Sequence, residues 1–426
     1  MSYFPEYRRV SVRGPHGLGK TALMSWDIWW YALTRDGEDW KIPTTASAWR
    51  QLTKFLWPEI HKWGRLLDWE KIQREPLTQK KELMSLSLKL GTGEAFAMAS
   101  DNSALMEGAH AGNLLYIFDE SKTIPNDTWD STEGAFSTGD AFWLACSTPG
   151  EPNGRFYDIQ SRKPGYEDWH VRHVTVDECI QAGRISPDWV EDRKRQWGEE
   201  SAVYQNRVLG EFASSDEDGV IPLAWIERAN QRWLEWKECK KEDEFISVGC
   251  DIARSGEDKS VLATRFGNVI SELRRYSKMD TMEMAGYITG FMRLQKKGYA
   301  VVDVIGIGAG VYDKVRENKI RAIAFNASEH TNLQDRSGEL GFINCRSAGW
   351  WNLRELLQYN EIALPPDDKL TGDLTAPHWR VVSGGKIQIE SKDDIKKRLG
   401  RSTDDGDAVI MAFFPKGPSG VDLVGW

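Results

Sequence analysis

Apolar residues recur with two alternating periods along the first half of the chain. Residues 7–12 alternate between polar and apolar side chains, as a strand does, and residues 22–30 then repeat apolar side chains at helical spacing. A second helical pattern covers residues 47–60. Further strands are predicted at residues 86–90, 95–99, 114–118 and 141–146. Because strands that alternate with helices form doubly wound sheets, this half predicts an α/β fold with a mainly parallel sheet.

The second half begins with three predicted strands that are joined by short turns. They cover residues 245–251, 260–264 and 269–276, and the short connections predict an antiparallel meander. A helix at residues 284–295 and a further strand at residues 299–304 follow. The pattern therefore predicts a second α/β core.

Residues 213–219 are small, polar and acidic, as a linker is, and an amphipathic helix follows them. A chain of 426 residues is also long for one hydrophobic core. The predicted domains are residues 1–212, a linker and connecting helix at 213–244, a second domain at 245–414 and a tail at 415–426.

Composition narrows the class of protein. The chain is 40% hydrophobic and 28% charged, it has no apolar run long enough to span a membrane, and it does not begin like a signal peptide. The five cysteines are scattered without a Cys-x-x-Cys pair, so we expect reduced thiols in a cytosolic protein without membrane contact. A net charge of −9 does not favour nucleic-acid binding, but a local basic strip is enough for it.

The segment GPHGLGKT fits the phosphate-binding P-loop pattern and lies between a predicted strand and a predicted helix. Gly14, Gly17 and Gly19 let the backbone wrap around phosphates, Lys20 supplies a charge for the β- and γ-phosphates, and Thr21 offers a hydroxyl to Mg²⁺. ATP and Mg²⁺ are the predicted ligands.

Two later strands end in residues that suit the same site. The apolar run at residues 114–118 stops at Asp119 and Glu120, where a P-loop ATPase holds Mg²⁺ and orients the attacking water. The strand at residues 141–146 ends in Ser147 and Thr148, which are predicted to contact the γ-phosphate.

Four acids of the second half predict a metal site. Asp251 and Asp303 each end a strand, and Asp404 and Asp407 share one face at the start of a helix. Carboxylates in this arrangement suit two Mg²⁺ or Mn²⁺ ions that cut a phosphodiester. Taken alone, the acids at 404 and 407 are also typical of an ordinary helix N-terminus.

A basic strip precedes this acidic helix directly. It follows a predicted β-hairpin at residues 379–389 and is expected to hold the DNA backbone near the metals. As a lone charge run it is also typical of a solvated helix face. Its members are Lys392, Lys396, Lys397, Arg398 and Arg401. The glycine-rich turn at residues 305–310 has the wrong spacing for a dinucleotide-binding motif, so we expect no such cofactor.

In their order and spacing, these motifs resemble the large terminase subunits of tailed bacteriophages, the ATPase–nucleases that package DNA into capsids. The likeness runs over nearly the whole chain. It comprises the P-loop, the strand that ends in Asp119 and Glu120, the turn Ser147-Thr148-Pro149, Asp251 in GCDIA, Asp303 in VVDVIGIGAG and the closing RSTDDGDA.

The resemblance implies an ASCE-type P-loop ATPase for the first domain and an RNase H-like nuclease with a mixed sheet for the second. It also implies that Asp251, Asp303 and Asp407 are catalytic metal ligands, with Asp404 as a fourth. The implied activities are ATP hydrolysis, which moves double-stranded DNA into the procapsid, and endonucleolytic cutting of concatemeric DNA.

The resemblance further implies partners. These are double-stranded DNA, the portal protein of the procapsid, a small terminase subunit that selects the DNA, and other copies of the chain in a ring, in the cytoplasm of the infected bacterial host. Whether the chain is a monomer in solution is left open.

Two parts of such a motor have no assigned residues. No glutamine-plus-aromatic adenine motif precedes Gly14, although Tyr3, Phe4 and Tyr7 are available to stack on a base. We therefore expect the P-loop to need a neighbouring subunit for efficient ATP hydrolysis. Arg13 and Arg155 are candidates for the arginine that such motors insert into a neighbour.

Two alternative functions fit the same motifs. One is a DNA-repair or helicase-type enzyme with both cores, which strand separation on a forked duplex would distinguish. The other is a second domain that acts as a non-catalytic DNA clamp, which failure to bind divalent ions near Asp251 and Asp303 would favour.

Overall fold

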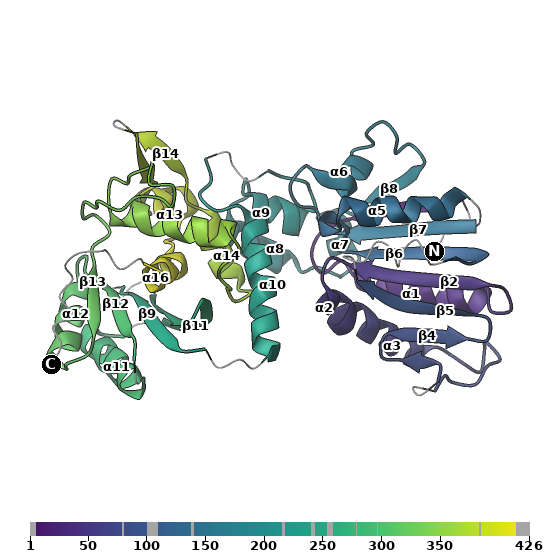
Figure 1. Ribbon diagram of the computed structural model, residues 1–426, viewed down its shortest axis with the longest axis horizontal. Coiled ribbons are helices and arrows are strands. Elements are labelled where there is room, and N and C mark those ends of the chain that lie inside the picture. Colours follow the sequence, from purple (N-terminus) through teal and green to yellow (C-terminus); the bar gives the residue numbers. More distant parts are fainter. Residues whose placement is uncertain are drawn as a thin grey trace. The chain divides into compact units, whose positions relative to one another are not determined.

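The computed structural model describes residues 6–78, 81–99, 110–137, 140–214, 218–239, 243–253, 259–277, 279–295, 297–382 and 385–414. The chain divides into two compact units (Figure 1). The first contains residues 1–191 and 204–214, and the second contains residues 192–203 and 215–426. The predicted tail at 415–426 and the middle of the predicted linker, residues 215–217, lie outside the described residues.

The first unit is built on one eight-stranded sheet with the order β3-β4-β5-β2-β6-β7-β1-β8. All neighbours from β5 to β8 in that order are parallel, and only the pairs β3–β4 and β4–β5 are antiparallel. The mainly parallel α/β sheet predicted from the sequence is therefore confirmed. The strands are β1 (Arg9–Arg13), β2 (Trp40–Ala46), β3 (Leu83–Met84), β4 (Ser87–Leu90), β5 (Gly93–Ala99), β6 (Asn113–Asp119), β7 (Asp140–Ser147) and β8 (Trp169–His173).

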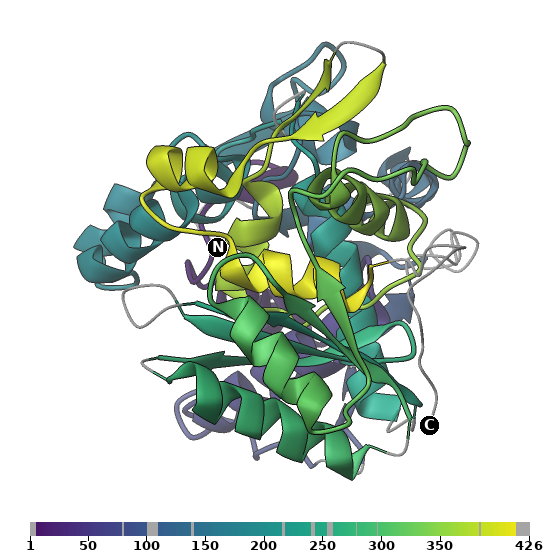
Figure 2. The ribbon, with the colours of Figure 1, turned by 90° about the vertical axis from the view of Figure 1, so that its left-hand side faces the viewer.

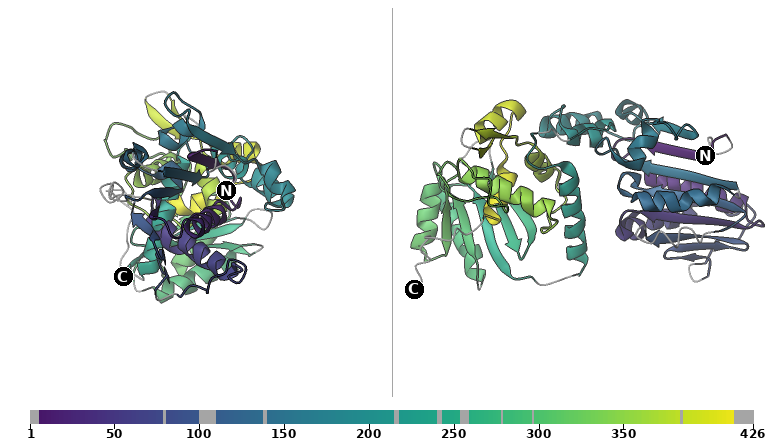
Figure 3. Two further views of the ribbon diagram at one scale, coloured as in Figure 1. Left: turned by 90° about the vertical axis from the view of Figure 1, so that its right-hand side faces the viewer. Right: turned by 45° about the horizontal axis from the view of Figure 1, so that its top comes forward.

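Helices cover both faces of this sheet (Figures 1 and 3). On one face α1 and α3 pack on β1, β2 and β6, and on the other α5 and α6 pack on β6 and β7. The helical segments of this part of the chain are α1 (Lys20–Thr34), α2 (Trp49–Gln51), η1 (Leu52–Leu56), α3 (Trp57–Leu66), η2 (Ser121–Thr123), α5 (Asn126–Glu133), η3 (Gly134–Ser137), α6 (Gly154–Gln160), α7 (Val176–Gln181), α8 (Pro187–Trp197), α9 (Ala202–Tyr204) and η4 (Gln205–Leu209).

Tryptophans supply much of the packing between these layers. Trp29 of α1 is buried, and its indole N–H donates to the Ile60 carbonyl of α3 over 2.9 Å. On the other face Trp129 and Trp143 are fully buried, and their ring centroids lie 5.1 Å apart. Their rings therefore fix where the helices lie on the sheet.

Strand β2, which lies in the middle of the sheet between β5 and β6, is not predicted from the sequence. Pro43 lies inside β2. Because proline has no N–H to donate to a neighbouring strand, it predicts the end of a strand at this point of the sequence. Side chains of β2 itself add hydrogen bonds to the neighbouring β5, because the hydroxyls of Thr44 and Thr45 donate to the carbonyls of Phe96 and Met98.

The second unit is built on a five-stranded sheet with the order β11-β10-β9-β12-β13. The first three strands form the predicted antiparallel meander, whereas β12 runs parallel to both β9 and β13. The mixed sheet is therefore confirmed, and its strand order is that of an RNase H-like core. The strands are β9 (Phe245–Asp251), β10 (Ser260–Phe266), β11 (Val269–Tyr276), β12 (Tyr299–Asp303) and β13 (Ala322–Phe325), with a separate hairpin of β14 (Trp379–Val382) and β15 (Lys386–Ile389). Residues 383–384, between these two strands in the sequence, lie outside the described part of the chain.

Helices again cover both faces. Figure 2 shows α11 and α12 along one face of the five-stranded sheet, where they bury apolar residues against β9 and β12, and α16 on the opposite face together with α13 and α10. The helices are α10 (Leu223–Cys239), α11 (Thr281–Leu294), α12 (Gly308–Glu317), α13 (Cys345–Gln358), α14 (Asp368–Thr375), α15 (Lys392–Leu399) and α16 (Asp404–Ala412).

The compact units differ from the predicted domain limits at two segments. Residues 192–203 group with the second unit, in which the indole N–H of Trp197 donates to the Asp368 carbonyl over 2.9 Å. Helix α10, predicted as a connecting helix, buries Ile226 and Ala229 in the core of the second unit. Among the described residues, no helix is long and apolar enough to cross a membrane.

Gly249 of β9 determines how closely α16 approaches the sheet. A Cβ at this position would overlap the Ala408 carbonyl oxygen and would lie 2.6 Å from the Ala412 nitrogen, both of them backbone atoms of α16. We therefore expect Gly249→Ala to lower the stability of the second unit by about 3 kcal/mol, because neither backbone can yield. Hydrogen exchange of the β9 and α16 amides measures this loss.

The matched control is Gly286→Ala in α11, where an added Cβ meets nothing within 4 Å. Alanine is the better helix former, so this variant should be neutral or more stable by up to about 1 kcal/mol. Equal protection in the two variants would contradict the packing argument.

Candidate functional site

The P-loop connects the end of β1 to the first residue of α1. Gly17 and Gly19 have φ angles of 79° and 99°, in the left-handed region that favours glycine. A Cβ at Gly14 would lie 2.7 Å from Leu18 Cδ2 and 2.9 Å from the Val174 carbonyl oxygen. All three glycines are thus required by the backbone path itself.

Lys20 points into the loop that precedes it. Its ammonium group donates to the Pro15 carbonyl over 2.9 Å and to the Gly14 carbonyl over 3.3 Å. Burial lowers the pKa of Lys20, while the nearby Glu120 and Asp119 act in the opposite direction. The lysine and the two acids are therefore close enough to influence one another.

The strand-end acids lie where β6 stops. Asp119 is buried, and burial together with the charge of Glu120 raises the pKa of Asp119 to about 7. The backbone N–H of Glu120 donates to Asp119 Oδ1 over 2.9 Å. Ser147, at the end of the neighbouring β7, donates its hydroxyl to Glu120 Oε2 over 3.1 Å. The hydroxyl of Thr148 is buried and has no partner among the described residues.

The segment η4 and the residues after it pack directly against the P-loop. Gly210 has a φ of 70°, and a Cβ there would lie 2.8 Å from Gly14 Cα. The amide of Asn206 donates to the Gly150 carbonyl over 3.1 Å. The P-loop and the turn after β7 are therefore joined through one short segment, and no motif in the sequence predicts this contact.

The two arginines proposed from the sequence are both held within this chain. Arg13 donates to Glu211 over 2.9 Å, and Arg155 forms an ion pair with Asp130. A third arginine, Arg184, lies against the P-loop instead, with Nη2 3.0 Å from the position of a Cβ on Gly19. It follows α7 in a stretch without a recognisable pattern, so no sequence signal points to it.

In the second unit, three of the four predicted acids surround one lysine. The ammonium of Lys392, the first residue of α15, lies 2.9 Å from Asp251, 3.0 Å from Asp404 and 3.4 Å from Asp407. Although burial would lower it, the three carboxylates raise the pKa of Lys392 well above its usual value. Lys392 was predicted to contact DNA phosphates, but here its charge points into the acid cluster.

Asp303, the fourth acid, ends β12 beside the end of β9. The register pairs Val302 with Cys250, so Asp303 and Asp251 follow at the same edge of the sheet. Burial raises the pKa of Asp303, and Asp407 adds to this effect while Lys392 opposes it. All four predicted acids therefore belong to one electrostatic cluster.

The acids of the cluster are held differently. Asp407 accepts from Arg346, from the Trp350 indole over 3.3 Å and from the Thr403 hydroxyl over 3.0 Å. Although burial alone would raise it, Arg346 and Lys392 lower the pKa of Asp407. Burial raises the pKa of Asp251 well above its usual value, and the neighbouring acids add to this effect.

Asp405, between two predicted ligands, faces away from the cluster. It accepts from Arg275 Nε over 3.0 Å at both carboxylate oxygens and from Lys369 over 3.4 Å. The buried Asp373 of α14 accepts from the backbone N–H groups of Asp405 and Gly406 over 2.9 Å and 3.3 Å. This second network fixes the first turn of α16.

The chemistry of the cluster suits a divalent cation. Four carboxylates outnumber the two cations, Lys392 and Arg346, that contact the cluster. Hard oxygen donors of this kind are the ligands that Mg²⁺ and Mn²⁺ prefer. Among the described residues no group of three or more His, Cys, Asp or Glu side chains is already spaced as a metal site. The ligand roles therefore stay predictions.

The basic strip is divided by the fold. Lys396, Lys397 and Arg398 lie on the exposed side of α15, whereas Ile395 is buried. Arg401 turns inward and pairs with Asp373. Three cations therefore remain at the surface of the helix that begins with Lys392.

The fold and the two sites define an α/β protein with a P-loop unit and an RNase H-like unit that carries an acid cluster. No family model matches the chain. It is similar to the probable large terminase subunit of Enterobacteria phage P7, at 23% identity over 319 residues, which are 70% of this chain and 62% of the relative. The chain thus spans about three fifths of that relative's length.

Solved large terminases are also similar to the chain, although only distantly. The large terminase of a thermophilic bacteriophage covers 96% of this chain and 94% of its own, with a TM-score of 0.44 and 15% identity. The nuclease domain of the large terminase subunit of bacterial virus Sf6 covers 46% of this chain and 99% of its own, with a TM-score of 0.40 and 21% identity. The chain resembles large terminase subunits, as its motifs predict.

Loss of charge at the two adjacent acids of α16 should change the stability of the second unit by very different amounts. Asp405→Asn removes a buried partner of Arg275 and should destabilise the second unit by about 3 kcal/mol. Asp404→Asn removes one of several like charges and should change stability by less than about 1 kcal/mol. Hydrogen exchange of the second-unit strands compares the two variants. Similar losses in both would argue against the division into two networks.

Proposed function

We propose that this chain is the large subunit of a phage terminase, which hydrolyses ATP to move double-stranded DNA into a procapsid and cuts that DNA at a separate metal-dependent site. The observation that carries the proposal is the presence of two distinct sites in one chain. One is a P-loop beside Asp119 and Glu120, and the other is a carboxylate cluster on a mixed sheet.

In the first unit the P-loop binds the phosphates of ATP. Lys20 places its charge on the β- and γ-phosphates, and Thr21 and Asp119 hold Mg²⁺. Glu120 orients and deprotonates the attacking water. Ser147 already holds one oxygen of Glu120 over 3.1 Å, which leaves the other oxygen for the water.

The hydroxyls at the end of β7 respond to the γ-phosphate in this proposal. The buried hydroxyl of Thr148 is available as a donor. The Gly150 carbonyl, two residues later, accepts from Asn206 in the segment that also touches Gly14. Through these contacts, loss of the γ-phosphate changes the position of residues 204–214, the last segment of the first unit.

In the second unit Asp251, Asp303, Asp404 and Asp407 hold two Mg²⁺ or Mn²⁺ ions. When bound, such ions activate a water and stabilise the leaving oxygen of a phosphodiester. Lys392 and Arg346 offset the repulsion among the carboxylates and keep them oriented toward one another. The exposed cations of α15 hold the DNA backbone beside the cluster.

The partners of this function are a portal protein, a small terminase subunit and further copies of the chain in a ring, in the cytoplasm of an infected bacterium. Arg184 is available in the same chain to assist the ATP site, in addition to any arginine from a neighbour.

Separate substitutions should abolish the two activities independently. Lys20→Ala removes the charge on the phosphates and should abolish ATP hydrolysis, yet spare Mn²⁺-dependent cleavage of plasmid DNA. Asp251→Ala removes a ligand and should do the reverse. Both assays on both variants test the proposal. If one substitution removed both activities from a folded protein, the assignment of two sites would be wrong.

The exposed lysines of α15 should contribute to DNA affinity through counterion release. Replacing Lys396 and Lys397 together by alanine should reduce the slope of log affinity against log salt by about 2, without a change in sequence preference. Fluorescence anisotropy with duplex DNA at several salt concentrations measures this slope. Lys297→Ala is the control, because Lys297 precedes β12 at the end opposite Asp303 and pairs with Glu244. An equal effect of the control would refute a local DNA contact.

A further inference from the structure

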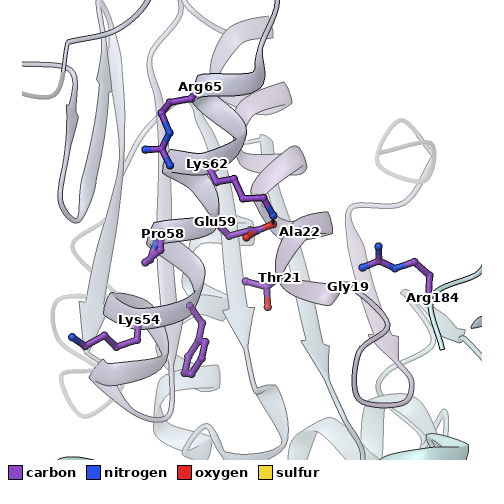
Figure 4. Close-up of a pocket in the computed structure, with 10 residues that line it drawn as sticks. Gly19, Thr21, Ala22, Lys54, Pro58, Glu59, Lys62, Arg65 and Arg184 are labelled. Atoms are coloured by element: carbon purple, nitrogen blue, oxygen red, sulfur yellow. Dashed lines mark hydrogen bonds and ion pairs between the residues drawn. The ribbon is translucent and has the colours of Figure 1, made fainter. Parts of the chain in front are cut away.

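A cavity of about 520 Å³ opens beside the P-loop. Its wall includes Gly19, Thr21 and Ala22 on one side and residues of η1 and α3 on another. In Figure 4 Glu59 and Lys62 extend from α3 toward Thr21, and Arg184 lies on the far side of Gly19. The volume falls in the range of ordinary small-ligand sites.

The cavity borders the P-loop at Gly19 and Thr21 without including the predicted hydrolytic acids. Neither Asp119 nor Glu120 lines it, and neither do the hydroxyl residues at the end of β7. The γ-phosphate belongs at the end that faces those acids. The cavity adjoins the start of α1 on a side that those acids do not occupy, so it is available to the nucleoside of a nucleotide whose phosphates lie in the loop.

The side chains in the cavity combine an aromatic ring with cations. Phe55 of η1 is 48% exposed and lines the cavity together with Pro58. Arg65 and Arg184 reach the cavity, and their guanidinium groups have no hydrogen bond or ion pair with any other part of the described chain. Lys62 is paired with Glu59 over 2.9 Å. An exposed ring suits a base, and unpaired guanidinium groups suit a phosphate next to it.

The aromatic residue that precedes the P-loop is already engaged. Tyr7 stacks on His170, with ring centroids 4.4 Å apart. Tyr3 and Phe4 lie outside the described residues. Of the described aromatic side chains, Phe55 is the one in the wall of this cavity.

We propose that this cavity receives the nucleoside of ATP, with Phe55 stacked on the base and with Arg65 and Arg184 beside the α-phosphate and ribose. The inference rests on the proposed ATP site at the P-loop. It assigns the adenine side of that site to the same chain, through a segment that follows β2 rather than one that precedes β1.

The test compares a ligand with a nucleoside and a ligand without one. Titration calorimetry measures binding of ADP and of inorganic triphosphate to the full chain in the presence of Mg²⁺. Phe55→Ala should weaken ADP about tenfold, as loss of one stacking contact does, and leave triphosphate affinity unchanged. Phe55→Trp should restore ADP binding, because it keeps the stacking surface.

Trp49→Ala is the matched control. Trp49 is 47% exposed on the adjacent α2 and does not line the cavity, so its loss should alter neither ligand. Arg184→Ala should weaken ADP more than Trp49→Ala does.

Unchanged ADP affinity in Phe55→Ala, or an equal loss of ADP and triphosphate, would overturn the inference. A wild-type chain that binds neither ligand would instead refute the proposed ATP site itself.

Discussion

Repulsion among clustered carboxylates is the constraint on which the second unit depends. Asp251, Asp303, Asp404 and Asp407 come to one edge of the sheet because β9 and β12 are parallel neighbours and because α16 begins beside them. Acids so placed would drive one another apart or take up protons. The fold opposes this with Lys392 at the centre and with a separate network, Asp373 and the Arg275–Asp405 pair, that anchors the helix bearing two of the acids.

The close contact between backbones has a comparable role in both units. Gly249 brings α16 against β9, and Gly210 brings the end of η4 against Gly14. In each case the absence of a Cβ lets a functional segment lie directly on its neighbour, so its position is set by main-chain atoms and not by flexible side chains. In the first unit this contact, together with Asn206 on the Gly150 carbonyl, joins the phosphate-binding loop to the turn after β7.

Much of the fold could be predicted because the local pattern of apolar and polar residues matches the strands and turns of the structure. The strands that end in Asp119, Ser147 and Asp303 have unbroken apolar runs, and the antiparallel meander has short turns. Strand β2 could not be predicted because Pro43 interrupts its sequence pattern. In the structure the side-chain hydroxyls of Thr44 and Thr45 add hydrogen bonds to β5. The grouping of residues 192–203 with the second unit could not be predicted. Helix α8 is continuous, and its sequence does not indicate that its C-terminal end belongs to the second unit.

The sequence by itself determined which chemistry is available. A P-loop needs glycines where φ is positive, with a lysine and a hydroxyl residue after them. Acids at the ends of strands can also be recognised from the sequence alone. Only the tertiary structure decided which charges meet. It turns Lys392 into the acid cluster, turns Asp405 out of it, and brings Arg184 and Phe55 into the wall of one cavity. These side chains are far apart in sequence, so their meeting depends on strand order and helix packing, which local residue patterns do not encode.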